Sequence, residues 1–139
     1  MEKMYTAKAT ATGGRNGKVK SADGSLDIET RMPKEMGGPS GTYLNPEILF
    51  AGGYAACFDS ALNLIIKMEK LQTGTTAVTA EVSIGKHNNG GYGLAVKLDV
   101  EIPGVDREKA QDLVNKAHQI CPYSNATRGN VDVELSVMS

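Results

Sequence analysis

Two cysteines, Cys57 and Cys121, are the residues of this sequence most able to carry covalent chemistry. Each lies in a segment with helical periodicity, on the apolar side of its helix; at about 100° per residue, Cys121 returns to the face of Ala110. The two thiols can therefore meet if the helices pack together. A simpler interpretation is that each is a small buried hydrophobe, because free cysteine is among the most buried residue types. Position alone favours this simpler interpretation.

A reactive thiol on an apolar face needs a positive neighbour that stabilises the thiolate. The candidates are four arginines, Arg15, Arg31, Arg107 and Arg128. Arg15 lies in a glycine-rich turn and could fold over a helix, where Glu47, near the start of the helix that carries Cys57, could receive it as a bidentate partner. The alternative is an ordinary solvated turn charge and an ordinary helix acid, because exposed ion pairs are common and contribute little.

Other kinds of site are less well supported. The segment CPYS at 121–124 is similar to the Cys-Pro-Tyr signature of glutaredoxins, but that signature opens a helix near the start of its domain, whereas here it follows a helical segment near the end. His87 and His118 lack Cys or His partners at ligand spacing, so we expect no metal. Nucleotide-binding glycine motifs are absent, so we expect no cofactor. His118 lies one turn before Cys121 and could act as a base, although a helix-end histidine is the simpler interpretation.

The elements that must position these residues follow from periodicity and turn chemistry. Alternation predicts strands over 5–12, 18–21 and 25–31, with a hairpin at Asp23-Gly24. After a loop over 32–44, Asn45-Pro46-Glu47 predicts a helix start, because Asn caps, Pro fits the first position and Glu favours the positive end of the dipole. This helix is expected to run to about Leu71.

The second half of the chain alternates in the same way. Strands are predicted over 78–84 and 94–102, joined by the turn HNNGG at 87–91. Asp106 is expected to cap a helix that runs to about Ile120, and a last strand covers 131–137. The order is βββ-α-ββ-α-β, which is an α+β pattern.

Composition bounds the class of protein. At 139 residues the chain is expected to form one domain over 1–139. The net charge of −1 is mixed along the chain and aromatic residues are 5%, which argues against a nucleic-acid partner. The N-terminal segment lacks the apolar core of a signal peptide, so a cytoplasmic location is expected.

The apolar stretch from Ile48 to Met68 has about the length of a membrane span, but Asp59, Asn63 and Lys67 interrupt it, so we expect no membrane insertion. A helix that is apolar on most sides cannot be covered by one small sheet. A second copy of the chain is the expected cover, which predicts a homodimer.

Three long segments carry a resemblance to a known family: ATATGGRNGKV at 9–19, NPEILFAGGYAACF at 45–58, and HQICPYSNATRGNVDV at 118–133. With them the sequence resembles the organic hydroperoxide resistance (Ohr) family of the Ohr/OsmC superfamily, over essentially the whole chain. The resemblance implies an OsmC-like α+β fold, with two buried helices packed against antiparallel sheets in an intertwined homodimer.

The resemblance also implies chemistry. Cys57 is then the peroxidatic cysteine, Cys121 the resolving cysteine, and Arg15 and Glu47 an ion pair beside Cys57. The implied substrates are organic hydroperoxides, including alkyl and fatty-acid hydroperoxides, with hydrogen peroxide used poorly. The implied reductant is a dithiol, typically a lipoylated protein. The residues expected to bind an alkyl tail are apolar, namely Phe50, Tyr54, Phe58 and Met36.

Two positions depart from the family pattern: Leu44 stands where Thr is usual, and Gly53 where Ala is frequent. Two alternative functions stay open. One is an OsmC-type peroxidase with a broader peroxide preference. The other is a non-enzymatic thiol redox sensor, although the sequence carries no recognisable DNA-binding or effector element.

Overall fold

The computed structural model describes residues 1–138. The chain divides into two compact units, Met1–Leu49 and Phe50–Ser139. The boundary falls within a helix, and the assignment of a single domain over the whole chain stays a prediction.

The first unit contains an antiparallel sheet of β1 (Ala9–Thr12), β2 (Lys18–Ser21) and β3 (Asp27–Glu29), in that order. β1 is shorter than the predicted 5–12, because Ala9 already pairs with Ser21, the last residue of β2. β3 also starts later than predicted, because Ser25 belongs to the turn, where its N–H and hydroxyl bond Asp23 Oδ1.

The turn between β1 and β2 forms a short 3₁₀ helix, Gly14–Asn16. Gly13 and Gly14 have φ of 74° and 61°, which is backbone that favours glycine. A Cβ on Gly17 would collide with the carbonyl oxygen of Thr12. The glycines that flank Arg15 are therefore required by the turn that presents it.

Helix α1 (Pro46–Met68) begins as predicted. Asn45 Oδ1 accepts a hydrogen bond from the Ile48 N–H at 2.8 Å, and Pro46 occupies the first helical position. The helix ends three residues before the predicted Leu71. Lys70 adopts a left-handed φ of 55°, and the Leu71 N–H returns to the carbonyl of Ile66, a helix-ending arrangement that usually uses glycine.

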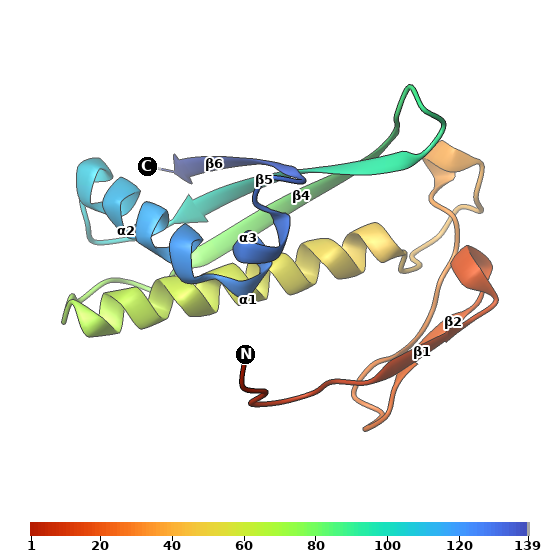
Figure 1. The fold of residues 1–139 in the computed structure, drawn as a ribbon, viewed down its shortest axis with the longest axis horizontal. Coiled ribbons are helices and arrows are strands. Elements are labelled where there is room, and N and C mark those ends of the chain that lie inside the picture. Colours follow the sequence, from red (N-terminus) through yellow and green to blue (C-terminus); the bar gives the residue numbers. More distant parts are fainter. Residues whose placement is uncertain (139) are drawn as a thin grey trace. The chain divides into compact units, whose positions relative to one another are not determined.

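The second unit contains a sheet of β4 (Ala77–Lys86), β5 (Tyr92–Glu101) and β6 (Asp132–Met138) (Figure 1). β4 and β5 form the predicted antiparallel hairpin, but β6 runs parallel to β5. The expectation of purely antiparallel sheets is therefore wrong for this sheet. The reason is the helical crossover between β5 and β6, which returns the chain in the same direction.

That crossover contains α2 (Arg107–Ile120) and a short helix, α3 (Pro122–Thr127), that was not predicted. α2 begins as predicted, with Asp106 Oδ1 accepting from the Lys109 N–H at 2.8 Å. Otherwise the predicted α+β order is confirmed.

One face of the second sheet is apolar and is covered by α1 and α2. Val96, Leu98 and Val100 of β5 point into the core and pair in register with Val133, Leu135 and Val137 of β6. From the helices, the core receives apolar side chains at helical spacing, among them Tyr54, Phe58, Leu62, Ile65, Leu113, Val114 and Ala117. By length and composition alone α1 could cross a membrane, and one face of this helix packs into the core of the second unit.

Charges join the C-terminal end of α1 to α2. Glu69 accepts from Lys109 Nζ at 2.7 Å and from Lys116 Nζ at 3.0 Å, and both lysines also contact Asp112. α1, which carries Cys57, and α2, which ends one residue before Cys121, are thus linked by ion pairs as well as by the apolar core.

Candidate active site

The structure brings the two cysteines together. Both are free, and the Cys121 thiol donates to Cys57 Sγ with 3.7 Å between the sulfurs. Cys121 has no exposed surface, whereas Cys57 is partly exposed. Because a disulfide joins its sulfurs at about 2.05 Å, closure from 3.7 Å requires an approach of about 1.7 Å.

The two sulfurs are held in different ways. Cys57 lies in the middle of α1, one turn after Tyr54 and next to Phe58. Cys121 lies between two helices: it follows the last residue of α2 and precedes Pro122, the first residue of α3, with φ of −62° and ψ of 123°. Proline disfavours helical backbone in the residue before it and suits the first position of a helix, so the Cys-Pro pair was the available signal for α3.

Burial raises the pKa of the Cys57 thiol. A hydrogen bond from the backbone N–H of Tyr123 opposes this and lowers the pKa, while the neighbouring Cys121 raises it further. The second unit by itself therefore favours the thiol form of Cys57. The sequence did not indicate the Tyr123 amide, because a backbone donor leaves no compositional signal. This amide is available to Cys57 because the first N–H groups of a helix have no partner within that helix.

In the first unit, the structure brings Arg15 and Glu47 together. Arg15 Nη1 donates to Glu47 Oε2 at 2.8 Å and Nη2 to Oε1 at 2.5 Å, which is a bidentate pair. The side chains are 27% and 14% exposed, so the pair is partly desolvated. The hydrogen bond from Arg15 lowers the pKa of Glu47, and the same bond raises the pKa of Arg15. Both groups are therefore charged at neutral pH.

The four residues expected to bind an alkyl tail differ in accessibility. Tyr54 and Phe58 have no exposed surface, so both serve the core in this structure. Phe50 is partly buried, and its ring packs against Tyr54 with 6.3 Å between centroids. Met36, in the first unit, is 38% exposed. Their role in substrate binding stays a prediction.

Tyr123 is an aromatic neighbour of Cys57 that the sequence did not single out. Its ring packs against Tyr54 with 5.8 Å between centroids and is 41% exposed. A Cβ added to Gly53 would lie 3.2 Å from the tip of this ring. Glycine at this position, where the family frequently has alanine, therefore lets the Tyr123 ring pack closely against α1. Leu44 stands where the family usually has threonine. Its backbone forms hydrogen bonds with the backbone of Glu29 and of Arg31, and such bonds do not depend on the side chain.

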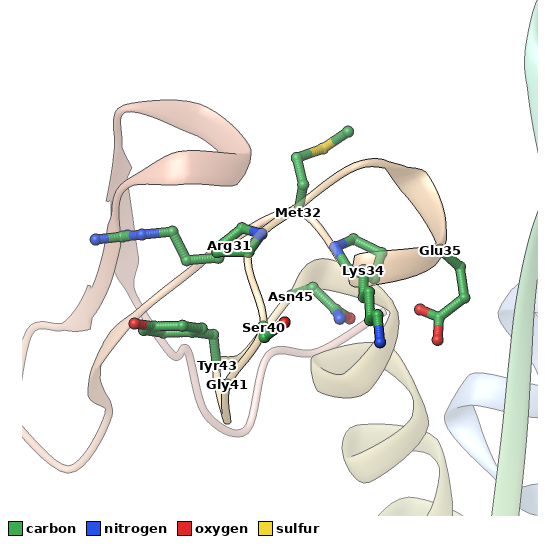
Figure 2. A pocket seen from close by; sticks show the side chains of 10 residues that line it. Arg31, Met32, Lys34, Glu35, Ser40, Gly41, Tyr43 and Asn45 are labelled. Atoms are coloured by element: carbon green, nitrogen blue, oxygen red, sulfur yellow. The ribbon is translucent and has the colours of Figure 1, made fainter.

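A separate pocket of about 400 Å³ lies in the first unit, and Figure 2 shows its lining from the loop that precedes α1. Arg31 forms part of its wall, with the guanidinium stacked on the Tyr43 ring at 5.3 Å from the centroid. Lys34, Glu35 and Asn45 line it as well. Neither Cys57 nor Cys121 belongs to its wall, so the sulfur pair is not part of this pocket.

Comparison with known proteins connects this geometry to a family. The model of the family "OsmC-like protein" matches residues 38–136. The organic hydroperoxide resistance protein of Xanthomonas axonopodis pv. citri is 50% identical over 135 residues, which are 96% of this chain and 94% of that protein. This chain belongs to the Ohr group of the OsmC-like family.

Solved structures of Ohr proteins have the same fold. The organic hydroperoxide resistance protein of Elizabethkingia anophelis, crystallised with thiocyanate, matches with a TM-score of 0.96 and 62% identity over 100% of this chain and 99% of that one. OhrB of Bacillus subtilis matches with a TM-score of 0.89 and 47% identity over 98% of this chain and 100% of that one. The OsmC-like α+β fold expected from the sequence is thereby confirmed.

Proposed function

We propose that this protein is a thiol peroxidase that reduces organic hydroperoxides to alcohols, with Cys57 as the peroxidatic and Cys121 as the resolving cysteine. The observation that carries the proposal is the pair of free sulfurs 3.7 Å apart, one of them partly exposed and the other buried. Membership in a family whose curated relatives are named for organic hydroperoxide resistance supports the choice of substrate.

In the first step, the Cys57 thiolate attacks the terminal oxygen of the hydroperoxide. The O–O bond breaks, the sulfur is oxidised to a sulfenic acid, and the alkoxide leaves and takes up a proton to become the alcohol. The partial exposure of Cys57 gives the peroxide access to this sulfur.

This step requires a thiolate, although burial raises the pKa of Cys57. We assign the compensating charge to Arg15. Its bidentate pair with Glu47 uses two of the five guanidinium donors and fixes the orientation of the plane, which leaves N–H groups for a sulfur anion or for the departing alkoxide. Glu47 belongs to the first turn of α1, the helix that also carries Cys57, which supports the assignment.

In the second step, Cys121 attacks the sulfur of the Cys57 sulfenic acid. The S–O bond breaks, a disulfide forms, and the thiol proton leaves with the hydroxyl group as water. An external dithiol then reduces the disulfide by two successive exchanges and is itself oxidised to a cyclic disulfide. A lipoyl group, carried on a protein, is the dithiol we propose.

Two further expectations accompany the mechanism. We propose a homodimer, because Ile48, Leu64 and Met68 of α1 are 46%, 50% and 67% exposed in the single chain. We also propose that the protein acts in the cytoplasm, where a cycling thiol pair is kept reduced between turnovers.

Multi-turnover consumption of cumene hydroperoxide with dihydrolipoamide tests the proposal, with Cys57→Ser as the control that should be inactive. Consumption of only one equivalent would instead indicate a redox sensor. Equal rates with hydrogen peroxide would indicate an OsmC-type peroxidase with a broader preference. Full activity in Cys57→Ser would exclude the assigned nucleophile.

A further inference from the structure

A buried cluster of hydrogen-bonded side chains lies beside the sulfur pair and has no part in the mechanism above. The Tyr54 hydroxyl lies 2.8 Å from Ser124 Oγ and 3.2 Å from Thr127 Oγ1, and Ser124 Oγ lies 2.8 Å from His118 Nδ1. Tyr54 and Ser124 have no exposed surface, Thr127 is 4% exposed, and His118 is partly exposed. We call these four residues the hydroxyl cluster.

Each hydroxyl of the hydroxyl cluster has one hydrogen to donate. Thr127 Oγ1 lies within hydrogen-bond distance of two backbone carbonyls, that of Tyr123 at 2.9 Å and that of Ser124 at 3.2 Å. When Thr127 donates to one of these carbonyls, it accepts from Tyr54, Tyr54 accepts from Ser124, and Ser124 accepts from the Nδ1–H tautomer of His118. The cluster is thus one connected chain of bonds that reaches the backbone of α3.

The hydroxyl cluster links the two sides of the sulfur pair. Tyr54 lies one turn before Cys57 on α1, whereas His118 and Ser124 lie three residues before and three residues after Cys121. The hydrogen bond between His118 and Ser124 thus spans the Cys121 junction, and the bond from Tyr54 attaches that junction to α1. The chain reaches the carbonyl of Tyr123, and the backbone N–H of the same residue lowers the pKa of Cys57.

Stability alone does not explain polar groups at these positions. A cluster of apolar side chains of the same shape would be about as stable, because the net gain from a hydrogen bond on folding is small. A fully satisfied buried network differs from an apolar one in being directional, so that it specifies one arrangement of the elements that it joins. Here those elements are α1, α2 and α3, and the arrangement includes the sulfur separation.

Resting on the proposed peroxidase cycle, we propose that Tyr54, Ser124, Thr127 and His118 are positioning residues for disulfide closure, which keep Cys121 within reach of the Cys57 sulfenic acid. Closure competes with over-oxidation, in which a second hydroperoxide transfers an oxygen to the sulfenic acid, gives a sulfinic acid and leaves as the alcohol. A well-positioned Cys121 therefore protects Cys57, and a poorly positioned one exposes it to inactivation.

The test compares Tyr54→Phe, which removes one hydroxyl and keeps the ring, with Tyr92→Phe, a matched control at a position that is 68% exposed. Reduced protein is treated with one equivalent and then with excess cumene hydroperoxide. Stopped-flow measurement gives the rate of disulfide closure, and intact mass spectrometry gives the partition between disulfide and sulfinic acid. Loss of the two hydrogen bonds of this hydroxyl, to Ser124 and Thr127, predicts closure that is roughly fivefold to a hundredfold slower in Tyr54→Phe. The sulfinic acid fraction should rise by a similar factor, with no change in Tyr92→Phe.

Thr127→Ser keeps a hydroxyl in the chain and should close nearly as fast as the wild type. Ser124→Ala likewise removes two bonds, to Tyr54 and to His118, and should close more slowly than the wild type by a similar factor. A Tyr54→Phe protein with lower thermal stability but the wild-type partition would show a purely structural role and overturn the inference. Failure of the wild type to form any disulfide with one equivalent would overturn the proposed function itself, and this outcome is distinct because it appears before any variant is made.

Discussion

The contact between Gly53 and Tyr123 gives a prediction that can be worked in numbers. In Gly53→Ala the new Cβ lies 3.2 Å from Cε2 and Oη of Tyr123, which is closer than ordinary van der Waals contact. Replacing a helical glycine by alanine gains about 0.5–1 kcal/mol, whereas overpacking a well-packed site costs about 1–3 kcal/mol. The Tyr123 ring is 41% exposed and can move outward, so the cost falls near the lower end of that range.

We therefore expect gain and cost nearly to cancel, so that Gly53→Ala changes the free energy of unfolding by no more than about 0.5 kcal/mol. Gly52→Ala is the matched control on the same helix, because a Cβ there meets no atom within 4 Å. This control should show the full gain of about 0.5–1 kcal/mol.

Urea unfolding followed by circular dichroism measures both variants, and equal slopes allow the midpoints to be compared directly. In a Tyr123→Ala background the obstacle is absent, so the two alanine substitutions should stabilise the protein equally. If Gly53→Ala already gains as much as Gly52→Ala with Tyr123 present, the ring does not press on α1 and the reasoning is refuted.

Three further predictions concern the chemistry. Cys121→Ser should reduce one equivalent of hydroperoxide and then stall or over-oxidise; normal cycling with dihydrolipoamide would show that Cys121 is not needed for resolution. Arg15→Ala should raise the pKa of Cys57, which titration of thiolate absorbance measures, and an unchanged curve would remove Arg15 from the mechanism. The pKa of Glu47 is lowered by Arg15, so the pair stabilises the fold above the ordinary carboxyl pKa of 4.5 and loses this contribution as pH falls through the lowered value. Glu47→Gln should remove that part of the acid dependence in urea unfolding measured at a series of pH values, and a profile that matches the wild type would exclude a stabilising role.

Local chemistry made much of the fold predictable. Asn45-Pro46 and Asp106 begin helices where expected, since a capping side chain and a proline act on the backbone next to them. The end of α1 was not predictable in the same way, because Lys70 adopts a left-handed conformation that sequence normally signals with glycine. The direction of β6 was also missed, because alternation indicates which face of a strand is buried but not which way the strand runs.

The candidate site likewise has features that local sequence could predict and features that it could not. The sulfur pair and the bond between Arg15 and Glu47 involve side chains whose chemical types already indicated how they could interact. The Tyr123 amide and the role of Ser124 depend on a backbone group and on tertiary proximity across three helices, which no local pattern encodes.

The location of Cys121 between α2 and α3 has a consequence for how the disulfide closes. Cys57 is embedded in a long helix, where moving the sulfur means either a new side-chain rotamer or a broken ladder of backbone bonds. Cys121 has extended backbone between two helices, so small rotations about its own dihedral angles can carry its sulfur forward without unwinding either neighbour. The sulfur that meets the peroxide can thus stay stationary, while the other travels the remaining distance and returns after each turnover.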